Sequence, residues 1–307
     1  MTLSIDQLNA ITDKHFIGKL RDNIFDSNPT LKKMKDGGSY VSVDGGTAIL
    51  ETLNYGQASS AGWYSGGDTL ATTDTENLTA ASYDWKSFYA GVTVTEEDEL
   101  KNSGDRAQLK LLKSKMQIAE KTLKDNLGTG IFSDGTTAKS IVGLRDVVAV
   151  DQTVGGISQT DNSWWQGQVD STTTVTTISA LNAVFQNCSV DSEIPNYCPT
   201  TRAIYNAYYA LLQPQQRFMD EKMAAGGFSS LMFNQAPVVH DSHCPASHFF
   251  ALNLDSLFLY YHPDRNMAFE PFQKPINQQV KVSRILFMGA FGSSNCRLNG
   301  KLSGLTS

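Results

Sequence analysis

The sequence predicts an α+β fold, because one long helical pattern has strand-like segments on both sides of it. The helical pattern runs over residues 105–127, and the strand-like segments cover residues 40–54 and 83–95. A further β-rich segment follows at residues 279–298, where we expect the chain to rejoin the sheet beside the helix. The 307 residues can form one large domain or two smaller ones, and the composition leaves both open.

The central helix is predicted from a capping residue and a narrow apolar stripe. Thr95 is suited to cap a first turn rich in Glu and Asp, and residues 102–104 then interrupt the pattern. From Asp105 onward, apolar residues recur at steps of three and four: Leu112, Met116, Ala119, Leu123 and Leu127. This spacing predicts a helix about 35 Å long with one buried face. Gly128 is expected to end it.

Composition and charge exclude several classes of protein. The chain has a net charge of −6, which argues against a protein whose main role is to grip nucleic acid through clustered Lys and Arg. Its longest apolar runs are far shorter than the roughly 20 residues needed to span a bilayer, and no signal peptide is visible. The four cysteines are widely spaced and form no CxxC pair, so we interpret them as reduced thiols.

Capping, apolar and turn residues predict the other elements. A capping-box pattern at Ser4 opens an amphipathic helix to Ile24, which could lie on its own core or on another subunit, and Asn28-Pro29 is expected to end it. After the central helix we expect a tight turn, a return strand at residues 141–150 and a surface segment at residues 151–177. Helices are predicted at residues 178–190 and 202–213, and short strands at residues 194–198, 228–233, 237–240, 249–254 and 257–262.

Residues 36–85 contain seven acidic residues and no Lys or Arg. They predict a long two-stranded excursion with turns at Gly45-Gly46 and Gly66-Gly67, which has too little apolar content to be stable alone in water. The central helix carries seven basic residues between Lys101 and Lys124. Opposite charges on an arm and a helix of one chain indicate head-to-tail contact between copies. A loosely ordered acidic loop is the alternative.

The residues expected at contacts between subunits fall into three groups. They are acidic and apolar residues of the loop, basic residues of the helix, and a tryptophan pair in a polar segment. In sequence order they are Glu51, Trp63, Tyr64, Asp68, Leu70, Asp74, Glu76, Arg106, Lys110, Lys113, Lys121, Lys124, Trp164 and Trp165. Adjacent tryptophans in polar surroundings more often anchor a subunit or domain contact than bind a ligand.

Residues 240–248 are the one segment with ligand atoms suited to a metal or to catalysis. They hold His240, His243, His248 and Cys244, but no second pair of ligands accompanies them, so a plain turn is favoured over a metal site. No nucleophile motif surrounds the cysteines, and no phosphate-binding glycine pattern follows a strand. The sequence therefore predicts no catalytic residue, cofactor or metal.

Motifs along nearly the whole chain resemble those of a known family. They are Asp44-Gly45-Gly46-Thr47, Tyr83-Asp84-Trp85-Lys86, Leu100-Lys101-Asn102-Ser103-Gly104, Phe132-Ser133-Asp134-Gly135-Thr136, Gly155-Gly156-Ile157, Trp164-Trp165, Asp241 with Cys244-Pro245, and Leu252-Asn253. With the order of elements, they make the chain similar to major capsid proteins of tailed double-stranded DNA bacteriophages, which have the Hong Kong 97-type fold.

The resemblance implies a division of the chain and a set of partners. It implies an N-terminal arm at residues 1–44, an extended β-hairpin loop at 45–83, a peripheral domain at 84–150 and 279–307 that contains the long spine helix, and an axial domain at 151–278. Such proteins form pentamers and hexamers of an icosahedral shell around packaged DNA, to which they make no sequence-specific contacts. Separate scaffolding protein, portal and decoration proteins are the other implied partners, and assembly in the host cytoplasm followed by residence in the virion is the implied localisation.

Two alternatives belong to other functional classes. An encapsulin-like compartment would share the fold but enclose a cargo enzyme. A metal-dependent enzyme would use the turn at residues 240–248. The resemblance also raises the question of cross-linking, because some family members join subunits through a loop lysine, and residues 45–83 contain none. We therefore expect subunits that separate as monomers under denaturing conditions.

Overall fold

The computed structural model describes residues 28–56, 60–70, 72, 76–101, 105–212 and 231–306, without the side chains of residue 99 and residues 105–109. The predicted N-terminal helix at residues 4–24 lies outside these ranges, as does Asp74. None of the described helices is long and apolar enough to cross a membrane.

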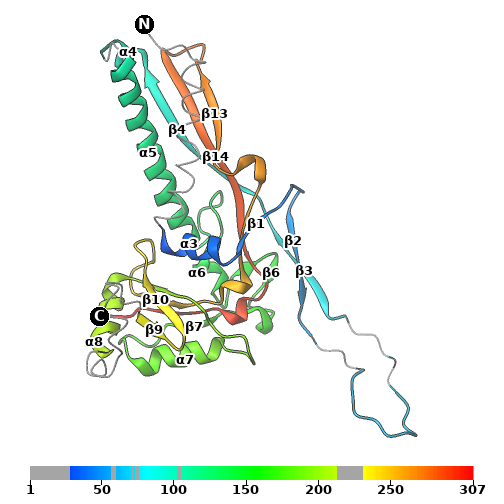
Figure 1. The fold of residues 1–307 in the computed structure, drawn as a ribbon. Coiled ribbons are helices and arrows are strands. Elements are labelled where there is room, and N and C mark those ends of the chain that lie inside the picture. Colours follow the sequence, from blue (N-terminus) through cyan, green and yellow to red (C-terminus); the bar gives the residue numbers. More distant parts are fainter. Residues whose placement is uncertain are drawn as a thin grey trace.

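The first sheet lies beside the long helix. Among the described residues it contains β1 (Tyr40–Ser42), β12 (Leu257–Tyr261), β14 (Val280–Ser293), β13 (Ala268–Gln273) and β4 (Lys86–Thr95). β4 pairs with β14 antiparallel over its whole length, from Lys86 opposite Gly289 to Thr95 opposite Val280. This confirms that the C-terminal segment rejoins the sheet next to the helix (Figure 1).

The long helix is α5 (Asp105–Ile131), which follows the short α4 (Glu96–Lys101). The hydroxyl of Thr95 accepts a hydrogen bond from the backbone N–H of Asp98, so the predicted cap is confirmed. All five residues of the predicted stripe are buried: Leu112, Met116, Ala119, Leu123 and Leu127. They pack against the side of β4 that carries buried apolar residues at alternate positions.

The predicted end of the long helix at Gly128 was wrong, and this glycine lies at a contact with Asn28. Gly128 does not end α5, which continues to Ile131. A Cβ at Gly128 would lie 2.6 Å from Nδ2 of Asn28 and 2.6 Å from the ring of His243, so the glycine serves close packing here rather than termination. The helix that Asn28-Pro29 was expected to end lies outside the described residues. The same two residues begin another helix, α3 (Pro29–Asp36), because the Asn28 side chain accepts from the first free N–H groups and proline suits the first turn.

The second sheet carries the middle of the chain. Its described strands, in spatial order, are β7 (Gln168–Asp170), β15 (Gly300–Ser303), β11 (His248–Ala251), β8 (Cys198–Thr200), β10 (Ala236–His240) and β9 (Leu231–Phe233). Helices α7 (Ile178–Cys188) and α8 (Arg202–Leu212) share a separate apolar cluster with it. Both helices and most of the short strands were predicted, although the strand expected at residues 194–198 begins only at Cys198.

The segment between the two sheets differs from the prediction. The Val-rich run before residue 150 contains a helical turn, α6 (Leu144–Val147), and not a return strand. Gly143 lies so close to the end of α5 that a Cβ would be 2.6 Å from the carbonyl oxygen of Ile131, so this segment packs directly on the end of the helix. Residues 151–177 are not only a surface segment, since Val154 and Trp165 are buried in it. The short β5 (Thr153–Val154) and β6 (Ile157–Ser158) form a hairpin there, followed by the 3₁₀ helix η2 (Ser163–Trp165). The described residues also contain the 3₁₀ turns η4 (Leu254–Ser256), η5 (Pro263–Arg265) and η6 (Cys296–Leu298).

The acidic segment forms a hairpin that projects away from both sheets (Figure 1). Its strands are β2 (Ile49–Asn54) and β3 (Leu78–Tyr83), paired antiparallel from Ile49 opposite Tyr83 to Asn54 opposite Leu78. The sequence placed the second strand at residues 83–95, which was wrong. Residues 86–95 form β4 instead, because the long β14 pairs with them and their apolar face is buried on α5.

Candidate inter-subunit contact surfaces

The hairpin has one face turned to its own chain and one turned outward. Ile49, Leu53 and Ala81 are buried on the inner face, whereas Leu50 and Leu78 are exposed on the outer face. This alternation follows from the two-residue period of a strand. The outer face therefore offers apolar surface that its own chain does not cover.

The far end of the loop is the most exposed apolar region of the hairpin. Trp63 has a relative exposure of 106%, and Tyr64 and Leu70 are also exposed. The predicted turn at Gly66-Gly67 is present: the N–H of Asp68 donates to the carbonyl oxygen of Ser65 over 2.9 Å, and the Asp68 carboxylate accepts from the N–H of Ser65 over 2.8 Å. One acid of the loop therefore shapes the tip, where a fully exposed tryptophan would be stabilised by burial on a partner.

Glu51 has a partner within its own chain. The hydroxyl of Tyr260 on β12 donates to the Glu51 carboxylate over 2.9 Å. Burial raises the pKa of Tyr260 above its usual value, and the neighbouring Glu51 raises it further, so the tyrosine remains a donor. Glu51 thus holds the inner face of the hairpin to the first sheet. Its predicted place at a contact between subunits does not follow from the structure, whereas Glu76 remains exposed.

The outward face of α5 carries a row of unpaired basic side chains. Lys110, Lys113 and Lys121 are exposed and form no ion pair with any residue that the structure describes. Lys124 does pair, with Glu120 at 2.9 Å, and so is less available to a partner. Ile118 lies exposed on the same helix. This face therefore combines positive charge with an apolar side chain; Arg106 belongs to α5, but its side chain is not described.

The two tryptophans of η2 play different roles. Trp165 is only 1% exposed, and its Nε1 donates to the carbonyl oxygen of Val154 over 3.1 Å. It is a core residue of its own chain, which corrects its predicted role at a subunit contact. Trp164 is half-buried and stacks on Tyr55 of the loop, with ring centroids 5.2 Å apart. The stack of Trp164 on Tyr55 thus connects the loop to the body of the same subunit.

The turn at residues 240–248 joins three elements. The buried carboxylate of Asp241 accepts from the hydroxyl of Thr30 on α3 and from the N–H of His243 over 2.9 Å. The ring of His243 lies 3.3 Å from the Asn28 side chain and 3.7 Å from the carboxylate of Asp125 on α5. Across the described ranges, no group of three His, Cys, Asp or Glu side chains is arranged to hold a metal. The turn predicted from the sequence is present, and its polar residues fix helix ends.

The cysteines lie in the interior. All four are unpaired and buried. Burial raises the pKa of the Cys188 and Cys296 thiols to about 12, so both remain protonated near neutral pH. A protonated, buried thiol is a poor nucleophile, and the thiols instead contribute to packing.

Comparisons with known proteins bear on the fold. In sequence, the chain matches no family model and no curated protein. In structure, it is similar to a subunit of the Cyanophage A-1(L) capsid with a TM-score of 0.66 and 15% identity, over 88% of this chain and 91% of that one. The chain has the Hong Kong 97-type capsid fold.

Two further structures share this fold with the chain. A capsid subunit of the empty GTA particle has a TM-score of 0.62 and 12% identity, over 88% of this chain and 89% of that one. The SrpI encapsulin from Synechococcus elongatus PCC 7942 has a TM-score of 0.57 and 11% identity, over 87% of this chain and 85% of that one. The predicted fold is therefore confirmed. Because both shells and an encapsulin adopt the Hong Kong 97-type fold, function requires a further argument.

Proposed function

We propose that the protein is the major capsid protein of a tailed bacteriophage and assembles into the pentamers and hexamers of an icosahedral shell around packaged DNA. The observation that carries this proposal is the match to a phage capsid subunit over 88% of the chain. Its residues act by forming interfaces, and no catalytic step is part of the proposed role.

Contact between neighbouring subunits runs from the loop of one to the spine helix of the next. The loop brings the exposed Trp63, Tyr64 and Leu70 together with acidic residues, and α5 presents Lys110, Lys113 and Ile118. Apolar and charged groups are thus complementary on the two surfaces. Exposed ion pairs contribute about 0–1 kcal/mol each, so burial of the aromatic tip supplies most of the affinity and the charges supply register.

The proposed subunit has an N-terminal arm, an extended loop, a peripheral domain around α5 and an axial domain. Strand pairing supports two changes to the boundaries expected from sequence. Residues 257–273 bond to β14 through β12 and β13, which favours their inclusion in the peripheral domain. β15 bonds to β11 and β7, which favours its inclusion in the axial domain.

Electron microscopy of the purified chain tests the proposal. We expect capsomers or closed icosahedral particles, formed alone or on addition of a separate scaffolding protein. A uniform small oligomer under all conditions would overturn it. Portal and decoration proteins complete the proposed set of partners, DNA is enclosed without sequence-specific contacts, and the proposed location is the virion after assembly in the host cytoplasm.

An encapsulin-like compartment is the second candidate, favoured by the structural match to the SrpI encapsulin. The content of particles separates the two. Particles isolated from the native source should protect DNA from nuclease if the protein is a phage capsid protein. A cargo enzyme in place of DNA would identify a compartment.

A further inference from the structure

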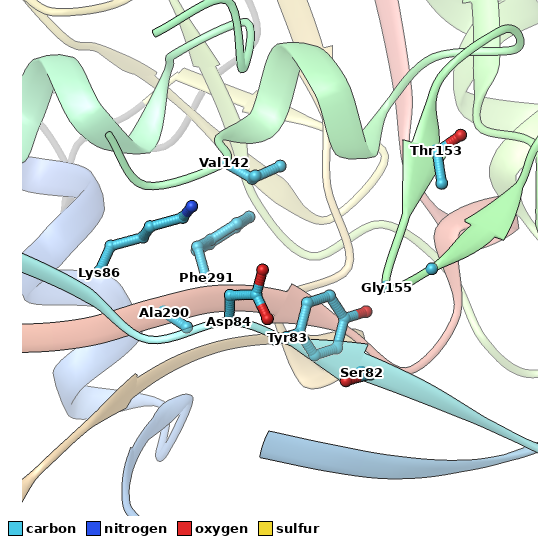
Figure 2. A pocket seen from close by; sticks show the side chains of 10 residues that line it. Ser82, Tyr83, Asp84, Lys86, Val142, Thr153, Gly155, Ala290 and Phe291 are labelled. Atoms are coloured by element: carbon cyan, nitrogen blue, oxygen red, sulfur yellow. The ribbon is translucent and has the colours of Figure 1, made fainter. Parts of the chain in front are cut away.

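The root of the loop encloses a small cavity that three segments of the chain share. The cavity has a volume of about 150 Å³. Figure 2 shows Ser82, Tyr83 and Asp84 on one side of it, Thr153 and Gly155 on the right, and Val142 and Phe291 on the left. It therefore marks the place where the hairpin, the β5–β6 turn and β14 meet.

Tyr83 fastens the hairpin to β14 through two hydrogen bonds to a single residue. Its hydroxyl donates to the carbonyl oxygen of Ser293 over 2.6 Å and accepts from the N–H of Ser293 over 3.0 Å. Its ring lies against Gly292, where a Cβ would be only 2.7 Å from the ring, so no larger residue fits there. A side chain that is 5% exposed and held at both the ring and the hydroxyl has little freedom to rotate.

The β5–β6 turn holds the same strand from the other side. Gly155 and Gly156 have φ values of 60° and 78°, as the two central residues of a tight hairpin turn require. The carbonyl oxygen of Gly155 accepts from the N–H of Ser82 over 2.9 Å. A Cβ at Gly155 would lie 2.6 Å from the side chain of Ala81. The turn therefore touches β3 directly, and the contact depends on glycine.

Small movements at this root become large movements at the tip. Gly66 lies 17 residues before Tyr83 in the sequence, so an extended strand could carry the tip up to about 55 Å from the root at about 3.3 Å per residue. A rotation of about 10° at the root would then move the tip by about 10 Å. This exceeds the distance over which apolar side chains remain in contact, about 4.5 Å.

We propose that Tyr83 is a positioning residue that sets the direction in which the loop leaves its subunit, and thereby determines whether the loop tip meets a neighbouring copy. The effect on contact between subunits rests on the proposed function, whereas the effect of Tyr83 on the direction of the loop does not. Tyr83 is buried within its own chain, so it acts on assembly only through the loop. Residues that never touch the neighbouring subunit thus control a contact with it.

Spin-label distance measurements on Tyr83→Phe test this proposal, because the substitution removes only the hydroxyl. Labels are placed at Ser65→Cys near the tip and Gln117→Cys on α5, and the native cysteines are all buried. Labelled chains are diluted into unlabelled ones so that distances within one subunit are measured. We expect the mean distance to shift, or its distribution to widen, by about 5 Å or more, since a rotation of about 6° is sufficient.

Tyr208→Phe is the matched control. Tyr208 is equally buried, and its hydroxyl donates to the carbonyl oxygen of Met232 over 3.0 Å, far from the loop. It should leave the distance unchanged. If Tyr83→Phe fails to fold, Gly155→Ala displaces the same strand and should shift the distance instead. An unchanged distribution in a folded Tyr83→Phe chain overturns the proposal, whereas failure of the native chain to assemble overturns only the proposed function.

Discussion

Replacement of Trp63 by Ala should weaken assembly without weakening the subunit. Trp63 is 106% exposed, so its loss removes no contact within its own chain and the melting temperature of the unassembled subunit should not change. If a neighbour covers the ring, about 150–250 Å² is buried, and tryptophans at the centre of interfaces commonly contribute about 2 kcal/mol or more. A loss of about 2 kcal/mol per loop raises the subunit concentration needed for assembly about 30-fold.

Light scattering over a series of subunit concentrations measures that threshold. Trp63→Phe serves as the control, since it keeps an aromatic ring and should fall between the native chain and Trp63→Ala. The reasoning would be refuted by a Trp63→Ala chain that assembles at the native threshold. It would also be refuted by a lowered melting temperature of the free subunit, because the ring would then pack within its own chain.

Other substitutions test the remaining contacts. Lys110→Glu with Lys113→Glu should reduce particle stability more at low salt than at high salt, since salt screens exposed charges within about 8 Å under physiological conditions; equal effects at both salt concentrations would contradict the charge contact. Trp165→Phe should lower the free energy of unfolding of the subunit by about 1–3 kcal/mol in chemical denaturation, because it leaves a buried carbonyl group without its donor. Gly128→Ala should destabilise the subunit by about 1–2 kcal/mol in the same assay despite a gain in helix propensity of about 1 kcal/mol. Denaturing electrophoresis of mature particles should give one band near 33.6 kDa, and a ladder of covalent oligomers would show a cross-link that the loop has no lysine to form.

The sequence predicts a helix or strand well where the local spacing of apolar residues and the capping residues are enough to specify it. The five apolar residues of α5 are buried as their spacing requires, and Thr95 caps the first turn. The same holds for β14, because its long apolar run predicts a buried strand. Periodicity and capping are local properties, so a single stretch of residues contains the information.

Pairing between strands is less predictable, because it depends on competition between distant segments. The second strand of the hairpin, β3, has the sequence LTAASY, which carries little apolar content and few strongly strand-favouring residues. The stronger candidate at residues 83–95 belongs to β4, which pairs with β14 nearly 200 residues later. Once β14 occupies that strand, β3 is the segment left to pair with β2. The sequence therefore predicts the presence of the loop but not its register or its attachment at Tyr83.

Three residues that the sequence interprets separately share one contact. Gly128 suggested the end of a helix, Asn28 the end of another, and His243 a possible ligand, yet the Asn28 and His243 side chains both lie where a Cβ of Gly128 would be. Glycine at position 128 leaves space for the Asn28 side chain, which caps α3. The ring of His243 in turn hydrogen-bonds to both Asn28 and the buried Asp241. Because each of these residues lies at least 100 positions from the other two in the chain, no local sequence pattern could predict the contact. The contact joins α3, the end of α5 and the turn after β10, so a substitution at any one of the three residues should loosen the other two elements as well.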